Sequence, residues 1–91
     1  DTRVLLQLPP LTEERREEFQ KIVGKKAEEA RIGMRKARDT AKQSIQSAEK
    51  DKLISEDEKF RMQKQLQEEA DKVMNQIASL EEEKRTELGR I

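Results

Sequence analysis

Apolar residues recur along this chain in two long series, mostly at steps of three and four residues. The first series comprises Phe19, Ile22, Val23, Ala27, Ala30, Met34, Ala37, Ala41, Ile45 and Ala48. The second series comprises Phe60, Met62 or Gln63, Leu66, Ala70, Val73, Ile77, Leu80, Leu88 and Ile91. Such spacing places apolar side chains along one stripe of a helix, as in a coiled coil. The pattern therefore predicts helices over about residues 12–50 and 55–90.

A short extended segment is expected before the first helix. The first eight residues contain an apolar run typical of a strand. Pro9 and Pro10 then remove two backbone donors and exclude the residue before them from the helical region. Thr12 is the expected N-cap, because its hydroxyl can accept from an amide in the first turn. We expect an extended segment with a proline hinge over residues 1–11 and a helical hairpin over residues 12–91.

A capping box separates the two predicted helices. Ser55 as N-cap and Glu58 at the third helical position satisfy two backbone donors reciprocally. The break over residues 50–54 is short and the helices are nearly equal in length, which favours an antiparallel hairpin. The expected fold class is all-α. Two helices bury only one narrow seam, so a third helix, a second chain or a ribonucleoprotein surface is expected to complete the core.

The amino-acid composition excludes several classes of function for this chain. With 91 residues, 44% charged and 32% hydrophobic, the chain is at most one small domain with little core of its own. Twenty basic and twenty acidic side chains cancel, so any attraction to an anionic partner depends on local clustering. Without cysteine or histidine, there are no disulfides, thiolate metal sites or imidazole bases. No apolar stretch approaches the roughly 20 residues that span a bilayer, so we expect a soluble, intracellular protein that does not enter membranes.

One row of basic side chains lies beside the first apolar series. We call this row the basic stripe, and it consists of Arg31, Arg35, Arg38 and Lys42. Like charges at this spacing repel each other mildly, so their arrangement in one row needs an explanation. Two explanations are open. The commoner one is a solvated face eased by Glu28 and Asp39. The other is a row of phosphate contacts, because guanidinium groups match phosphate oxygens. No aromatic residue is interleaved, so folded RNA is a more natural target than single-stranded bases.

The remaining charged groups have simpler explanations. Arg15 and Arg16 form a second small basic group, for which pairing with Glu14 or Glu18 is the preferred interpretation. The acidic runs are interpreted as helix caps and solvated faces, because a catalytic carboxylate needs a water-excluding pocket that a narrow hairpin does not offer. We expect no enzymatic activity, no cofactor, no metal site and no small-molecule substrate.

Five segments read together resemble the C-terminal half of ribosome recycling factor. They are LPPLTEERR at 8–16, KIV at 21–23, AEEAR at 27–31, RKAR at 35–38 and ISEDE at 54–58. In that family the proline segment leads from a small β domain into a three-helix bundle whose other helix comes from the N-terminus. The resemblance implies that this chain holds the hinge and the last two helices of the bundle, without its N-terminal helix.

The resemblance also implies a partner and a site. The family's bundle lies against large-subunit ribosomal RNA and, with elongation factor G, helps to split post-termination ribosomes. Its RNA-contacting arginines correspond to Arg35 and Arg38, and also to Arg31 and Arg15. Asp39 stands where many members carry a further arginine. The expected location is the cytoplasm, or an organellar matrix or stroma.

A second hypothesis rests on the apolar series alone. Two hairpins with uncovered apolar faces could meet as a four-helix bundle. On this reading the chain is a structural coiled-coil module that self-associates as a homodimer.

Overall fold

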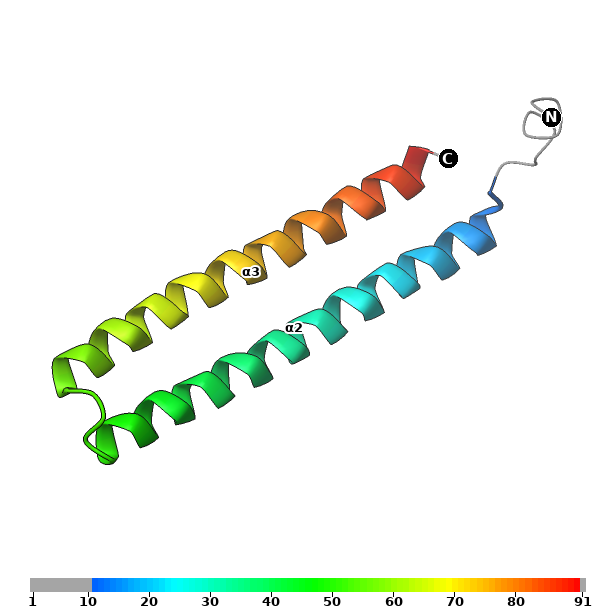
Figure 1. The fold of residues 1–91 in the computed structure, drawn as a ribbon. Helices are drawn as coiled ribbons and strands as arrows, with labels where there is room; N and C mark the ends of the chain where they lie inside the picture. The colour runs from blue at the N-terminus through cyan, green and yellow to red at the C-terminus, as the bar shows by residue number, and fades with distance from the viewer. Residues whose placement is uncertain (1–10, 91) are drawn as a thin grey trace, which may run out of the picture.

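A computed structural model describes residues 11–90 of the chain. It contains helix α2 (Glu13–Lys50, 38 residues) and helix α3 (Glu56–Arg90, 35 residues). The two helices lie side by side and run antiparallel, so the start of α2 and the end of α3 lie at the same end (Figure 1). The predicted all-α hairpin is confirmed. The expected extended segment and the hinge at Pro9 and Pro10 lie outside the described residues.

Both predicted N-caps are present. The Thr12 hydroxyl accepts from the Arg15 amide at 3.1 Å. At the start of α3, the Ser55 amide donates to the Glu58 carboxylate at 3.1 Å, and the Glu58 amide donates to the Ser55 hydroxyl at 3.1 Å. The hydrogen bonds from the Ser55 amide and hydroxyl group hold the pKa of Glu58 below its ordinary value. These caps satisfy amides that have no partner within the helix.

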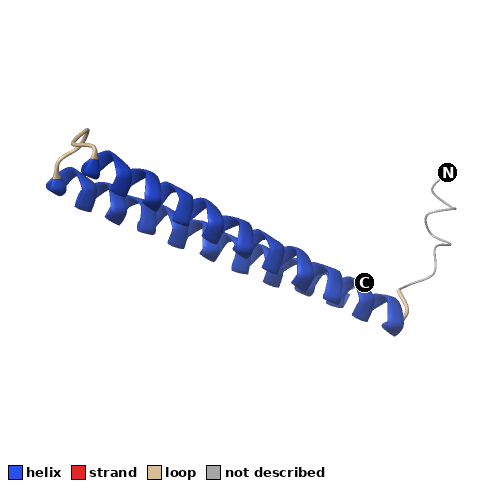
Figure 2. Ribbon diagram, turned by 90° about the horizontal axis from the view of Figure 1, so that it is seen from below, coloured by secondary structure: helices blue, strands red, loops and turns tan. Residues whose placement is uncertain are grey.

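The end of α2 has a backbone feature that the sequence did not indicate. Lys52 adopts a left-handed conformation with φ of 61°. Its amide donates to the Glu49 carbonyl at 2.9 Å, and the Leu53 amide donates to the Ala48 carbonyl at 2.8 Å. These two bonds form a Schellman motif, in which glycine is the usual residue at the position of Lys52. The chain thus reverses direction in a few residues, and the loop appears at the far end of the hairpin in Figure 2.

The seam between the helices differs in part from the predicted apolar series. Its buried residues are Ala27, Ile45 and Ala70. Ala30 and Ala37, which were expected in the seam, are exposed. The reason is that α2 carries two adjacent apolar lines, and a single neighbouring helix covers only one narrow stripe. Arg31 falls on the covered side instead and is half-buried.

An apolar groove runs beside the seam on one side of the hairpin. One part has a volume of about 290 Å³ and is lined mainly by Ile22, Val23, Ala27, Ala30, Ile77 and Leu80. A second part of about 300 Å³ is lined by Leu11, Phe19 and Leu88 together with Ile22, Val23, Lys84 and Glu87. Ile22 and Leu80 remain about half exposed. Within residues 11–90, the hairpin therefore leaves part of its apolar surface uncovered, as its composition predicted.

Candidate nucleic-acid interface

The four residues of the basic stripe all lie on α2, on successive turns of one continuous helix. At 1.5 Å per residue the stripe is about 16 Å long. Its members differ in exposure: the side chain of Arg31 is 23% exposed and that of Arg35 is 45% exposed. Arg15 is exposed but lies about 24 Å further along the helix, so it is not brought together with the stripe.

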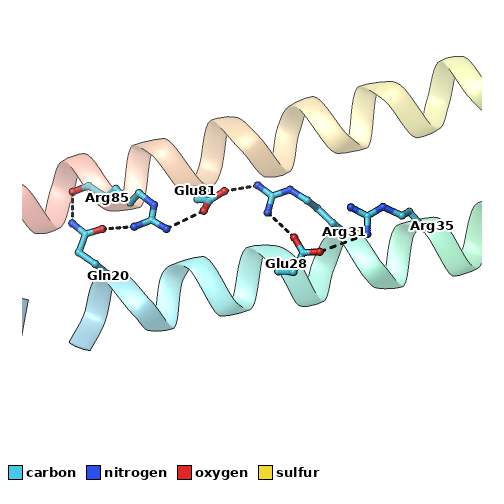
Figure 3. Close-up of polar contacts among 6 residues, drawn as sticks. All are labelled: Gln20, Glu28, Arg31, Arg35, Glu81 and Arg85. Atoms are coloured by element: carbon cyan, nitrogen blue, oxygen red, sulfur yellow. Dashed lines mark hydrogen bonds and ion pairs between the residues drawn. The ribbon is translucent and has the colours of Figure 1, made fainter. Parts of the chain in front are cut away.

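Arg31 is held in a polar network that joins the two helices (Figure 3). Its guanidinium donates to the carboxylate of Glu81 on α3, which also accepts from Arg85 at 3.1 Å. Arg85 donates to the side-chain oxygen of Gln20 at 3.0 Å, and the Gln20 amide donates back to the Arg85 carbonyl at 3.2 Å. The carboxylate of Glu81 raises the pKa of Arg31, mainly through their hydrogen bond. Arg31 therefore has a structural role in the described hairpin.

A glycine makes room for this network. A side-chain carbon added at Gly24 would lie 2.8 Å from a terminal nitrogen of Arg85. The glycine thus permits the guanidinium of Arg85 to approach the backbone of α2 closely. A glycine inside a helix is ordinarily unfavourable, and the reason for this one becomes visible only when Arg85 of the other helix lies beside it.

Glu28, about one turn before Arg31 on α2, pairs with the first two arginines of the stripe. Its carboxylate contacts Arg31 at 3.4 Å and Arg35 at 3.6 Å (Figure 3). Glu28 therefore reduces the repulsion between Arg31 and Arg35, as expected from the sequence. An anionic ligand that binds Arg35 must compete with this carboxylate.

The second half of the stripe has fewer intramolecular partners. Arg38 contacts the carboxylate of Asp39 at 3.2 Å. Asp39, which was expected to ease the charge of the stripe, does so by pairing with the adjacent Arg38 and makes no ion pair with Arg35. Lys42 is exposed and makes no ion pair with any residue in the range 11–90. Arg35, Arg38 and Lys42 are thus the stripe residues whose charge is most accessible to a ligand.

The network around Glu81 gives a pH-dependent contribution to stability. Hydrogen bonds from Arg31 and then Arg85 hold the pKa of Glu81 below its ordinary value of 4.5. A carboxyl whose pKa is lowered by folding contributes stability above its unfolded pKa and loses that contribution as the pH falls through its folded pKa. Glu81→Gln should therefore lower the midpoint of thermal unfolding near neutral pH. The difference in midpoint between this variant and the parent chain should shrink below pH 4.5.

Circular dichroism melts at neutral and acidic pH measure this effect. Glu82→Gln is the matched control, because it neutralises the exposed neighbouring carboxylate and leaves the network intact. If the difference in midpoint between Glu81→Gln and the parent chain stays constant from neutral to acidic pH, the ionised Glu81 carboxylate does not stabilise the hairpin.

The described residues contain neither a cluster of metal-ligating side chains nor a membrane-spanning helix. No three His, Cys, Asp or Glu side chains within residues 11–90 are grouped to hold a metal ion. Over the same range, neither helix is apolar enough along its length to cross a membrane.

Comparison with known proteins identifies relatives along almost the whole chain. The family model described as ribosome recycling factor matches residues 1–88. The ribosome-recycling factor of Carboxydothermus hydrogenoformans is 45% identical over 85 residues, which is 93% of this chain and 46% of the relative. That of Cutibacterium acnes is 46% identical over 81 residues, which is 89% of this chain and 44% of the relative.

The protein of the same name from Symbiobacterium thermophilum is 41% identical over 85 residues, again 93% of this chain and 46% of the relative. This chain therefore spans about half the length of the curated relatives that it matches. No solved structure gives a significant match. The family match and the identities nevertheless agree with the motifs in the sequence, and the chain belongs to the ribosome recycling factor family.

Proposed function

We propose that this chain is the RNA-binding helical half of a ribosome recycling factor. In this proposal it lies against large-subunit ribosomal RNA, and the whole protein acts with elongation factor G to separate the subunits after termination. The observation that carries the proposal is the family match over residues 1–88. The role is that of a translation factor rather than an enzyme, in the cytoplasm or in an organelle that holds ribosomes.

The charge distribution on α2 supports RNA as the ligand. Arg35, Arg38 and Lys42 present accessible positive charge along one side of a straight helix. Such side chains bind phosphates through charge-assisted hydrogen bonds that position a protein on folded RNA. Arg31 supports this surface indirectly, because it links α2 to α3. Arg15 would provide a separate contact nearer the hinge.

The apolar groove is the proposed position of the third helix of the bundle. Its lining residues come from both helices, and along the first half of the chain it extends from Leu11 to Ala30. A helix with one apolar stripe would cover these side chains and complete a core that two helices leave open. A second copy of the chain could cover the same groove, but the family relationship favours a translation factor over a self-associating module.

Binding to isolated large ribosomal subunits tests the proposal. Co-sedimentation should show saturable binding to large subunits that weakens as salt rises, because phosphate contacts release counterions. Glu28→Gln should raise the affinity by about two- to fivefold, since it removes the carboxylate that competes for Arg35. This increase is informative because most substitutions at a binding surface lower affinity.

Glu29→Gln is the matched control for that variant. It makes the same change in net charge, but Glu29 pairs with Lys26 outside the stripe. Equal effects of the two variants would indicate a general response to net charge. The absence of any salt-dependent binding to large subunits by the parent chain would refute the proposed function.

A further inference from the structure

A polar groove lies between the two helices at the second half of the basic stripe. Its volume is about 370 Å³. One wall comes from α2 and the other from α3, and its lining residues are Arg38, Asp39, Lys42, Gln63, Leu66 and Gln67. A pocket of this size is at the small end of the range for ligand sites, so it suits one unit of a larger ligand rather than a helix.

The two walls differ in chemistry. The α2 wall has two cations and one carboxylate, and the α3 wall has two amides around the half-buried Leu66. Gln67 donates to the Asp71 carboxylate at 2.9 Å, which holds its amide in one orientation. Gln63 is half-buried and makes no side-chain hydrogen bond to any other residue in the range 11–90. The groove therefore combines positive charge, neutral donors and acceptors, and a small apolar floor.

We propose that the polar groove binds one nucleotide unit of ribosomal RNA, with Gln63 and Gln67 as contacts on α3. This inference rests on the proposed function, and it extends the RNA surface from one helix to two. The phosphate would lie against Arg38 and Lys42. The amides of Gln63 and Gln67 would bind the ribose or a phosphate oxygen, which are common targets of glutamine in nucleic-acid complexes.

The mixed lining favours RNA over an acidic peptide. The 2′-hydroxyl of ribose both donates and accepts, so it can bind an amide and the carboxylate of Asp39. Asp39 repels a phosphate and a peptide carboxylate alike, but the nucleotide also carries a hydroxyl that can donate to Asp39, whereas the carboxylate side chain of an acidic peptide has no donor to offer it. Leu66 supplies an apolar surface for the carbons of the sugar.

Removing both amides tests the inference. Gln63→Ala combined with Gln67→Ala should weaken binding to large subunits by about five- to twentyfold, because two hydrogen bonds are lost. The slope of affinity against salt should stay unchanged, because neither substitution removes a charge. Gln65→Ala with Gln76→Ala is the matched control, since both glutamines are exposed on α3 outside the groove.

Two results separate this inference from the proposed function. If the parent chain binds and the Gln63 and Gln67 double variant binds equally well, the groove is not part of the interface and the inference is overturned. If the parent chain fails to bind large subunits, the proposed function itself fails. Gln63→Glu provides a second variant of nearly the same shape, and its added negative charge should weaken binding at least as much as the loss of one amide.

Crosslinking identifies what occupies the groove. A photoreactive benzophenone side chain placed at position 67 and activated on large subunits should give a product that ribonuclease degrades. A product that only protease degrades would show that a ribosomal protein segment fills the groove, and would overturn the assignment to RNA.

Discussion

Replacing Arg35 and Arg38 together with alanine should weaken binding to large ribosomal subunits by about 100- to 10,000-fold, as expected for two charge-assisted hydrogen bonds. It should also make the affinity less sensitive to salt, because each lost phosphate contact lowers the slope of log affinity against log salt by about 0.7 to 0.9. Co-sedimentation at several salt concentrations measures both quantities. A variant that merely misfolds would bind less tightly without this specific change in salt dependence, so the two effects together identify a loss of phosphate contacts.

The choice of these two arginines follows from their partners in the free chain. Their ion pairs, with Glu28 and Asp39, join exposed carboxylates to guanidinium groups that remain partly open to solvent, so they contribute little to stability. Replacement of Arg31 would be ambiguous, since it would also break the link to Glu81.

A matched control removes two positive charges from the other helix. Arg61→Ala with Lys72→Ala changes exposed residues of α3 outside the polar groove and should leave binding nearly unchanged. Identical affinity and identical salt dependence of the Arg35 and Arg38 double variant and the parent chain would rule out the basic stripe as an RNA surface.

The sequence predicts the helices well because their ends depend on local chemistry. Thr12 caps α2, and Ser55 with Glu58 caps α3, through hydrogen bonds between residues three positions apart. Such contacts form whatever the rest of the fold does. The same spacing argument located the basic stripe, since positions on one helix face follow directly from the period of the helix.

The sequence does not predict which apolar line faces the other helix, because that depends on the register of the hairpin. The register brings Arg31 against Glu81, although 50 positions separate them in the chain. The left-handed conformation of Lys52 likewise has no signal in the residue type. The polar groove was missed for the same reason: Gln63 becomes a candidate ligand contact only when α3 lies beside Arg38.

Truncation of Ile45 should have the largest effect on the stability of the hairpin. Ile45 is 9% exposed and is the largest of the three buried apolar residues. Replacing such a side chain with alanine removes buried apolar surface and leaves a cavity, at a cost of about 2 to 3 kcal/mol. For a chain of this size, that cost corresponds to a fall of about 10 to 20 °C in the midpoint of thermal unfolding.

Ile32 offers a control of the same residue type in the same helix. It is 43% exposed, so Ile32→Ala removes an equal volume without opening a cavity in the seam. Both variants gain the higher helix propensity of alanine, which is worth a few tenths of a kcal/mol, and this gain cancels in the comparison. Thermal and urea unfolding followed by circular dichroism should therefore show Ile45→Ala well below the parent chain and Ile32→Ala close to it. Equal destabilisation by the two substitutions would mean that the seam through Ile45 does not hold α2 against α3, because loss of an exposed isoleucine would then matter as much as loss of a buried one.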